Sequence, residues 1–201
     1  MSQTLVKWLL AAALAISAAG CSSSSSDSTN NDDDDGDGDT GDTVSESPAS
    51  AGDLRFNEVM ADPVILIESQ GEWFEIRNPT GTRFNLRDCV FSDASTNNFS
   101  VTTDLEIDAG ELRTFAISAT PGFTPDFNYN GSGLTLNNNG DTLILTCNGI
   151  TIDTRNYVAA AVASGRSSSA SANGNGKWCF DLGNVYNGDR GSPGLANVNC
   201  P

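Results

Sequence analysis

The chain has 201 residues, carries a formal net charge of −16 and contains no histidine. The missing histidine excludes a Ser-His-Asp or Cys-His catalytic arrangement, and an acidic chain without a basic stripe is not expected to bind nucleic acid. The sequence also lacks a nucleophile elbow, a phosphate-cradling glycine loop and closely spaced cysteine pairs of the kind that bind zinc. We therefore expect no catalytic residue, no metal and no cofactor.

Residues 1–20 predict an export signal. Lys7 precedes a run of twelve uncharged residues, 8–19, and Gly20 closes the segment. A basic start, a short apolar stretch and small residues at the cut are typical of signal peptides, and the run is too short to span a bilayer stably. An ordinary secretory signal followed by a chance cysteine is the alternative to a lipoprotein signal.

Cys21, directly after these small residues, resembles the cysteine of a bacterial lipobox, although Ala18 stands where lipoboxes usually carry Leu. The resemblance implies cleavage before Cys21 and acylation of its thiol and new amino group, with palmitate among the fatty acids. Cys21 is thus the predicted lipidation site, and a membrane is the predicted partner of the anchor. Ser22, in place of the Asp that marks inner-membrane retention, resembles lipoproteins sent to the outer membrane.

Residues 21–50 predict a disordered linker that begins at the lipidated cysteine. Nine of the 26 acidic residues lie between 22 and 50, among serine, glycine and threonine. Such a composition buries too little apolar surface to fold and suits a tether. The aspartate run 32–39 also suggests calcium, but no closing glutamate sits in register for an EF-type loop, so diffuse counter-ion binding is the expectation.

Residues 51–201 predict one all-β domain, because apolar residues alternate with polar ones between turn signals. The alternating segments are 73–77, 89–91, 99–101, 105–107, 115–117, 134–136 and 143–147. Asn148-Gly149 predicts a type I′ hairpin that pairs Leu145 with Ile152 and places Cys147 beside Ile150, all facing the core. Residues 158–163 fit either a helical turn or an edge strand. This count of short strands and turns predicts a two-sheet antiparallel sandwich.

Four cysteines remain after Cys21, an even number that favours disulfides in an exported domain. Cys89 and Cys147 occupy inward-facing strand positions, whereas Cys179 and Cys200 lie in the irregular C-terminal part. Of the three possible pairings we favour Cys89–Cys147 and Cys179–Cys200. Four reduced thiols and a zinc site are the alternatives.

Several blocks, in order, resemble the lamin tail domain. They are FNEVMADP at 56–63, GEWFEIRNP at 71–79, Leu86 with CVFSD at 89–93, LTLNNNGDTLIL at 134–145, Ile152-Asp153 with Tyr157, and GDRGSPG at 188–194 with Asn197. The resemblance implies an immunoglobulin-like β-sandwich that serves for binding and scaffolding in nuclear lamins and also occurs in bacterial surface proteins. Cys89 departs from the family, which commonly places Trp there.

Eight side chains are candidates for a site. Glu58, Glu72 and Glu75 could supply paired carboxylates for glycoside hydrolysis, although pairing with Arg77 or capping of backbone groups is the favoured interpretation. Asp62, Asp93 and Asp141 could form an oxygen-rich cation site, although turn chemistry explains each separately. Trp73 and Trp178 fit packing positions, and an exposed pair would suit carbohydrate.

The sequence favours a membrane-anchored, non-enzymatic lipoprotein of the cell envelope, surface or periplasmic, whose sandwich binds an envelope or extracellular protein or a glycan. Two alternatives stay open. The first is an accessory module to an exported nuclease or phosphatase, because bacterial lamin tail domains also accompany such enzymes. The second is a carboxylate-dependent protein that binds or hydrolyses glycans.

Overall fold

The structure is a computed structural model that describes residues 45–201. The predicted export signal at 1–20, Cys21 and linker residues 22–44 lie outside the described residues, so the predictions made for them stay predictions. Within the described part, no helix is both long and apolar enough to cross a membrane.

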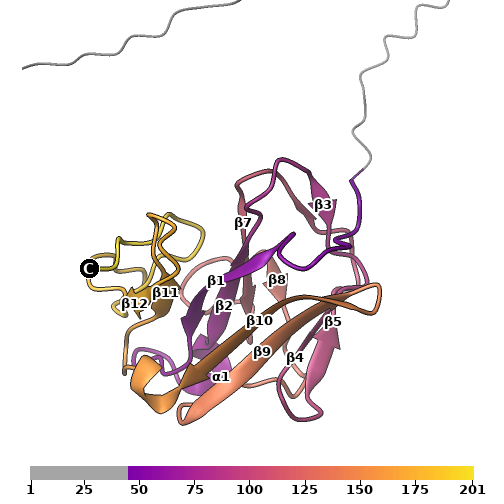
Figure 1. The fold of residues 1–201 in the computed structure, drawn as a ribbon. Coiled ribbons are helices and arrows are strands. Elements are labelled where there is room, and N and C mark those ends of the chain that lie inside the picture. The colour runs from indigo at the N-terminus through magenta and orange to yellow at the C-terminus, as the bar shows by residue number, and fades with distance from the viewer. Residues whose placement is uncertain (1–44) are drawn as a thin grey trace, which may run out of the picture. The chain divides into compact units, whose positions relative to one another are not determined.

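Two sheets packed face to face form a sandwich (Figure 1). The larger sheet has the order β12-β11-β1-β2-β7-β8, with β1 at Arg55–Met60, β2 at Trp73–Arg77, β7 at Leu112–Ala116, β8 at Phe127–Asn128, β11 at Ser168–Ala170 and β12 at Trp178–Phe180. The smaller has the order β10-β9-β4-β5, with β4 at Val90–Ser92, β5 at Asn98–Ser100, β9 at Gly140–Cys147 and β10 at Ile150–Val158. A separate pair joins β3 at Phe84–Asn85 to β6 at Glu106–Ile107.

The predicted all-β sandwich is confirmed, and every pairing is antiparallel except β7 with β8. Helical structure in residues 45–201 is limited to α1 at Glu68–Gly71 and a 3-10 turn at Ala159–Ala161. The stretch 158–163 therefore contains a helical turn rather than an edge strand. Leu134 and Leu136 are buried as their alternation suggests, but they lie in a segment without strand pairing.

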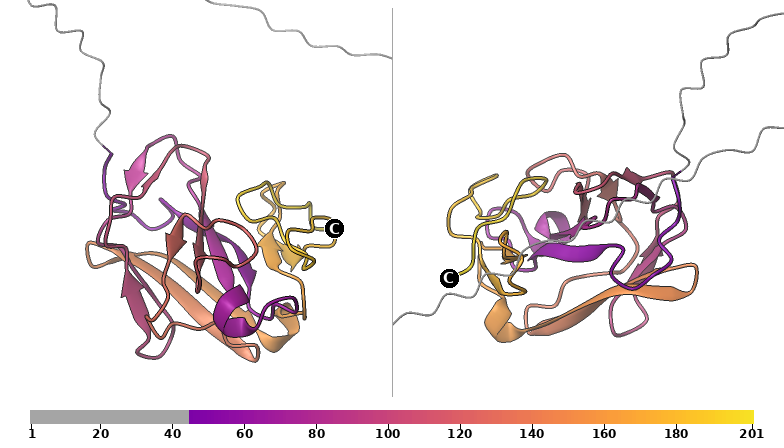
Figure 2. Two further views of the ribbon diagram at one scale, coloured as in Figure 1. Left: turned by 180° about the vertical axis from the view of Figure 1, so that it is seen from behind. Right: turned by 45° about the horizontal axis from the view of Figure 1, so that its top comes forward.

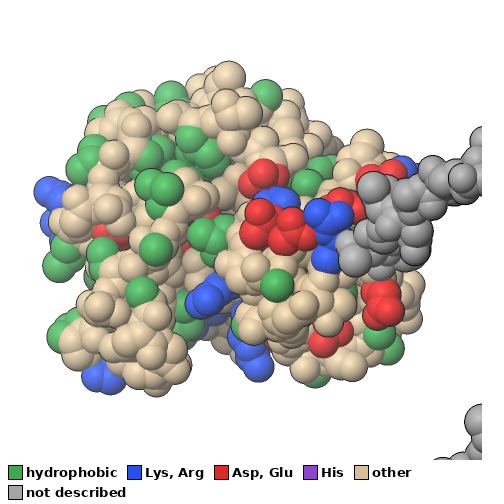
Figure 3. All heavy atoms as spheres, turned by 90° about the horizontal axis from the view of Figure 1, so that it is seen from above, with side chains coloured by type: hydrophobic (Ala, Val, Ile, Leu, Met, Phe, Trp, Pro, Cys, Tyr) green, Lys and Arg blue, Asp and Glu red, His purple; other side chains and the backbone are tan. Residues whose placement is uncertain are grey.

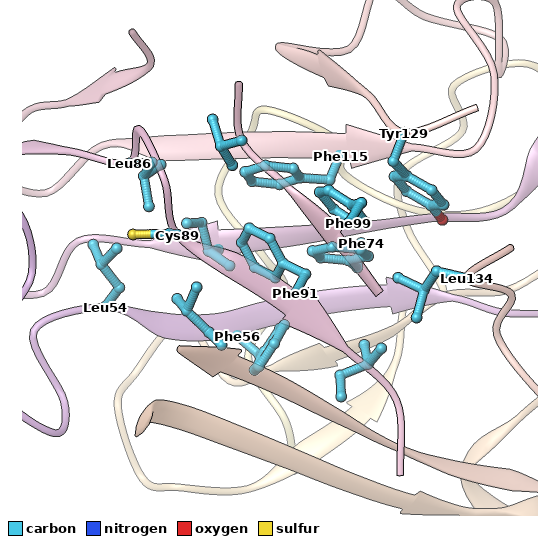
Figure 4. Packing of buried hydrophobic residues seen from close by; sticks show 14 of the residues in the cluster. Leu54, Phe56, Phe74, Leu86, Cys89, Phe91, Phe99, Phe115, Tyr129 and Leu134 are labelled. Atoms are coloured by element: carbon cyan, nitrogen blue, oxygen red, sulfur yellow. The ribbon is translucent and has the colours of Figure 1, made fainter. Parts of the chain in front are cut away.

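Phenylalanine rings fill the space between the sheets (Figure 4). Phe74 of β2 stacks on Phe115 of β7 with ring centroids 5.2 Å apart, and Phe91 of β4 meets Phe115 at 4.6 Å. Phe99 stacks on Tyr129 at 4.8 Å. Each such pair is worth about 1 kcal/mol beyond the area it buries, so this aromatic cluster holds the two layers together.

The β9–β10 hairpin corrects one predicted register. Asn148 and Gly149 adopt positive φ angles of 52° and 76°, as a type I′ turn requires. A bulge at Ile152 then shifts the ladder, so Leu145 lies opposite Asp153 rather than Ile152. Ile152 still reaches the core, whereas Ile150 stays 43% exposed. The prediction that all four side chains face the core was therefore wrong for Ile150, because a bulge gives one strand an extra residue.

The outer face of the larger sheet is also covered. Met60, Trp73 and Ala116 form a second small apolar cluster on that face, against Phe123 and Tyr186. Residues from about 170 onward gather at one end of the sandwich, beside β11 and β12 (Figure 2). The alternation of Trp73 with Phe74 therefore reflects two buried faces rather than one buried and one solvated face.

Segment 45–50, which the sequence assigns to the linker, contacts the sandwich. Glu46 bridges to Phe84 of β3, and the Asn148 side chain donates to Ser47 Oγ at 3.0 Å. Pro48 is buried. The folded unit thus includes residues before Ala51.

Candidate functional site

Two disulfides join the four cysteines of the domain. Cys89 and Cys147, both fully buried, link the loop before β4 to the end of β9 across 4.3 Å between Cα atoms. Cys179 of β12 is bonded to Cys200, with Cα atoms 5.6 Å apart. These are the pairs that the sequence favours, and they leave no free thiol among residues 45–201.

Glu58 lies fully buried on β1. It sits beneath residues 188–194, which we call the closing loop. Its carboxylate accepts hydrogen bonds from Ser167 Oγ, from the Ser192 amide at 2.9 Å and from Ser192 Oγ at 2.8 Å. Burial raises the pKa of Glu58, and these hydrogen bonds oppose the rise. Glu58 therefore fixes the C-terminal loop to the sheet.

Glu75 lies opposite Glu58 on the neighbouring strand and also fixes the closing loop to the sheet. It accepts from Asn57 Nδ2 at 2.7 Å and from the Gly194 amide at 2.6 Å. Burial raises its pKa to about 8. The predicted capping of backbone groups is present, whereas none of the ion pairs among residues 45–201 joins these glutamates to the exposed Arg77.

Glu72 is 2% exposed and accepts a 2.8 Å hydrogen bond from the Leu136 amide. Burial raises its pKa to about 8 as well. This contact explains how the unpaired segment around Leu136 is held against the sheet. All three candidate glutamates are thus occupied with loop backbone or with neighbouring polar side chains, and none is presented to solvent.

The three candidate aspartates do not form a cation site, because no group of three potential ligands occurs within residues 45–201. Asp93 accepts from the Ser95 amide at 2.7 Å and from Asn97 Nδ2 at 3.0 Å. Burial favours a raised pKa for Asp93, but these hydrogen bonds outweigh it and the pKa is lowered. Asp141 accepts from the Thr142 amide at 2.7 Å, and the Asp62 carbonyl accepts from the Gly165 amide. The Asp93 and Asp141 side chains thus serve their own loops, whereas the Asp62 backbone joins two loops.

The two tryptophans have different surroundings. Trp73 is fully buried, and its Nε1 donates to the Tyr186 hydroxyl at 3.1 Å. Trp178 on β12 is half-buried, and the Arg155 guanidinium lies 3.5 Å from its ring centroid. The exposed pair that would suit carbohydrate is therefore absent from the described part, and Trp178 alone faces a concavity.

That concavity is a candidate binding site. A groove of about 560 Å³ lies where β1, β2 and β10 meet the C-terminal segment. Its walls carry Arg55, Arg77, Arg155, Lys177 and Trp178 together with one acidic residue, Asp153, and we call it the cationic groove. Figure 3 shows Lys and Arg side chains gathered beside a hollow of the surface. The volume falls within the range of small-ligand sites, roughly 300–1,000 Å³.

The cationic groove could not be predicted from the sequence, because its residues are scattered along the chain. Four of the nine basic residues of positions 51–201 line it, but they come from two strands, a hairpin and a loop. Only the three-dimensional pairing of β1 with β2, which places Arg55 directly opposite Arg77, brings the first two together. A search for a basic stripe along the sequence could not find them.

Residues 47–159 match the family model described as Lamin Tail Domain. The chain belongs to the lamin tail domain family. No curated protein matches the chain. The match ends at the start of the 3-10 turn Ala159–Ala161, so the closing loop 188–194 lies beyond it, although the sequence resemblance includes that loop.

The cationic groove lies across the boundary of the lamin tail domain match. Arg55, Arg77 and Arg155 belong to the matched region, whereas Lys177 and Trp178 follow it. β11 pairs with β1 and so attaches this C-terminal segment to the larger sheet of the lamin tail domain. The groove is therefore built jointly by the family fold and by the segment that follows it.

Proposed function

We propose that the protein is a membrane-anchored, non-enzymatic binding module of the cell envelope. Lipid at Cys21 holds it to the membrane, residues 22–44 act as the tether, and the lamin tail domain presents the cationic groove to a ligand. One observation carries the proposal: this concavity is lined by four basic side chains, Trp178 and only one carboxylate, Asp153, whereas the candidate glutamates that could act as acid and base are buried under loops.

The glutamates support a binding role rather than hydrolysis. A glycosidase needs two carboxyl groups that flank one substrate bond in an accessible cleft. Glu58 and Glu75 are both fully buried, and their oxygens accept hydrogen bonds from the loop at 192–194. Opening them to a substrate would require that loop to leave the sheet.

The predicted lipobox supports the lipid anchor, and the acidic linker supports a tether between the anchor and the domain. Two or more acyl chains on Cys21 give stable membrane attachment, whereas a single chain gives only marginal attachment. Ser22 favours the outer membrane as the final location. The length of the linker would let the domain reach a ligand away from the lipid surface.

The test is the intact mass and the distribution of the protein between membrane and aqueous fractions. The wild-type protein should be extracted from membranes with a mass that corresponds to cleavage before Cys21 plus fatty acids. The Cys21→Ser variant should carry no lipid and move to the aqueous fraction, and Ser22→Ala is the matched control that keeps the lipid. An unlipidated wild-type protein would contradict the anchor.

A further inference from the structure

We propose that the cationic groove binds a short oligosaccharide that carries carboxylates, such as a chain of uronic acids. The proposal rests on the binding function proposed above and names its ligand class. It is carried by the excess of basic side chains in the groove, four against the single carboxylate of Asp153, by the aromatic ring beside them and by the size of the concavity.

Three of the five arginines outside the groove pair with carboxylates, whereas Arg166 and Arg190 form no ion pair within residues 45–201. Arg83 pairs with Glu106 at 3.3 Å, and Arg87 and Arg113 pair with carboxylates at 2.7 Å and 2.8 Å. In a domain with 17 acidic residues against nine basic ones in positions 51–201, such pairing is the expected outcome. The groove differs from all of these positions because it brings three arginines together in one concavity.

Of the groove arginines, Arg77 and Arg155 lack such partners, and Asp153 in the groove wall is only distantly paired with Arg55. Among the ion pairs of residues 45–201, none involves Arg77 or Arg155, and Arg55 reaches the Asp153 carboxylate only at 4.0 Å. Arg55 also stands directly opposite Arg77 across β1 and β2. Like charges at directly opposed positions destabilise a sheet. A bound anion between them would turn this repulsion into attraction.

Arg155 is positioned to recognise a carboxylate. Its guanidinium lies over the Trp178 ring, which fixes the plane of the guanidinium group. Its Nε is buried without a hydrogen-bond partner in the described part of the chain. Burial also lowers the pKa of Arg155, with the nearby Asp153 carboxylate opposing this. A planar guanidinium held in this way suits two parallel hydrogen bonds to a carboxylate.

The remaining features favour a short sugar acid. The volume of about 560 Å³ accommodates a few sugar rings rather than a polymer, and the acidic surface beyond the groove repels long polyanions. Trp178 offers an apolar edge for ring carbons, and Thr154 and the backbone at Gly174 line the same groove for hydroxyl groups. A rigid sugar ring also loses less conformational entropy on binding than a flexible acidic peptide.

The experiment is a calorimetric titration of the full chain in the Cys21→Ser background with tetragalacturonate, at low and physiological salt. Arg77→Gln should weaken binding about fivefold or more, because it removes a charge-assisted contact. Arg155→Gln should weaken it about tenfold. Arg87→Gln, which removes an equal charge outside the groove, should leave the affinity within about twofold, as expected for an exposed site.

Arg77 is exposed and unpaired among the described residues, so its variant keeps the test valid if Arg155→Gln fails to fold. No binding of tetragalacturonate, equal losses in Arg77→Gln and Arg87→Gln, or equal affinity for neutral cellotetraose would overturn the proposal. Tighter binding of a tetra-aspartate peptide would overturn the ligand class and leave the binding function standing. Recovery of shortened tetragalacturonate after the titration would instead overturn the non-enzymatic function while the ligand class stands.

Discussion

Replacing Glu75 by Gln should remove an unusual pH dependence of stability. Burial raises the pKa of Glu75 from its ordinary value of 4.5 to about 8, with hydrogen bonds from Asn57 and Gly194 opposing the rise. Between these two values the unfolded chain has lost the proton and the folded chain keeps it. The folded state therefore binds more protons, so the free energy of unfolding falls as the pH rises through this window.

The magnitude follows from proton linkage. A group that is protonated when folded and ionised when unfolded lowers the free energy of unfolding by about 1.4 kcal/mol per pH unit. Glu75 should therefore remove about 3 kcal/mol of stability between pH 5.5 and pH 7.5. Glu72, whose pKa burial also raises to about 8, should act in the same direction. Below pH 4.5 and above pH 8 these contributions should stop changing.

The assay is urea unfolding followed by tryptophan fluorescence at pH 5.5, 6.5 and 7.5, with Trp73 as the buried reporter. Glu75→Gln should show a slope shallower than wild type by about 1.4 kcal/mol per pH unit. Glu46→Gln, at an exposed position, should keep the wild-type slope. A wild-type slope in Glu75→Gln would show that Glu75 is ionised in the folded state and would refute the reasoning.

Two further substitutions test the packing of the sandwich. Replacing both Cys89 and Cys147 by Ala should lower the free energy of unfolding by about 4 kcal/mol, because a chain-entropy estimate for their sequence separation of 58 gives that value. Guanidinium unfolding with and without reductant measures this loss. An unchanged unfolding midpoint in the variant would contradict the prediction. Gly191→Ala should destabilise by about 1–3 kcal/mol, because its Cβ would lie 3.0 Å from Trp73 Cζ2. Gly81→Ala, with open space around its Cβ, is the control, and equal melting temperatures for the two variants would show that the closing loop yields freely.

The fold could be predicted largely from local patterns. Alternation around Phe74 and the positive-φ turn at Asn148 identified strands and a hairpin, because period two and Asn-Gly chemistry are local signals. The bulge at Ile152 could not be predicted, because its register is set by the neighbouring strand of the sheet. The cysteine pairs could be chosen from their positions, since two lay on inward-facing strands and two in one irregular segment.

The candidate site could be predicted from the sequence less fully than the fold. Glu58 and Glu75 were expected to have structural roles, but their partners in the closing loop lie over 100 residues away. The opposition of Arg55 and Arg77, and the stacking of Arg155 on a distant ring, arise only from sheet pairing and from the C-terminal segment that β11 attaches to β1. Long-range pairing therefore forms the cationic groove, which local patterns along the sequence do not predict.

The most direct measurement follows the indole N–H resonances of the full chain, in the Cys21→Ser background, during titration with tetragalacturonate. Trp178 lines the cationic groove, whereas Trp73 does not line it, is fully buried and donates to the Tyr186 hydroxyl. The Trp178 resonance should shift in proportion to occupancy, and the Trp73 resonance should stay in place. A titration that moves Trp73 or the closing loop and leaves Trp178 unchanged would contradict the assignment of the groove as the binding site.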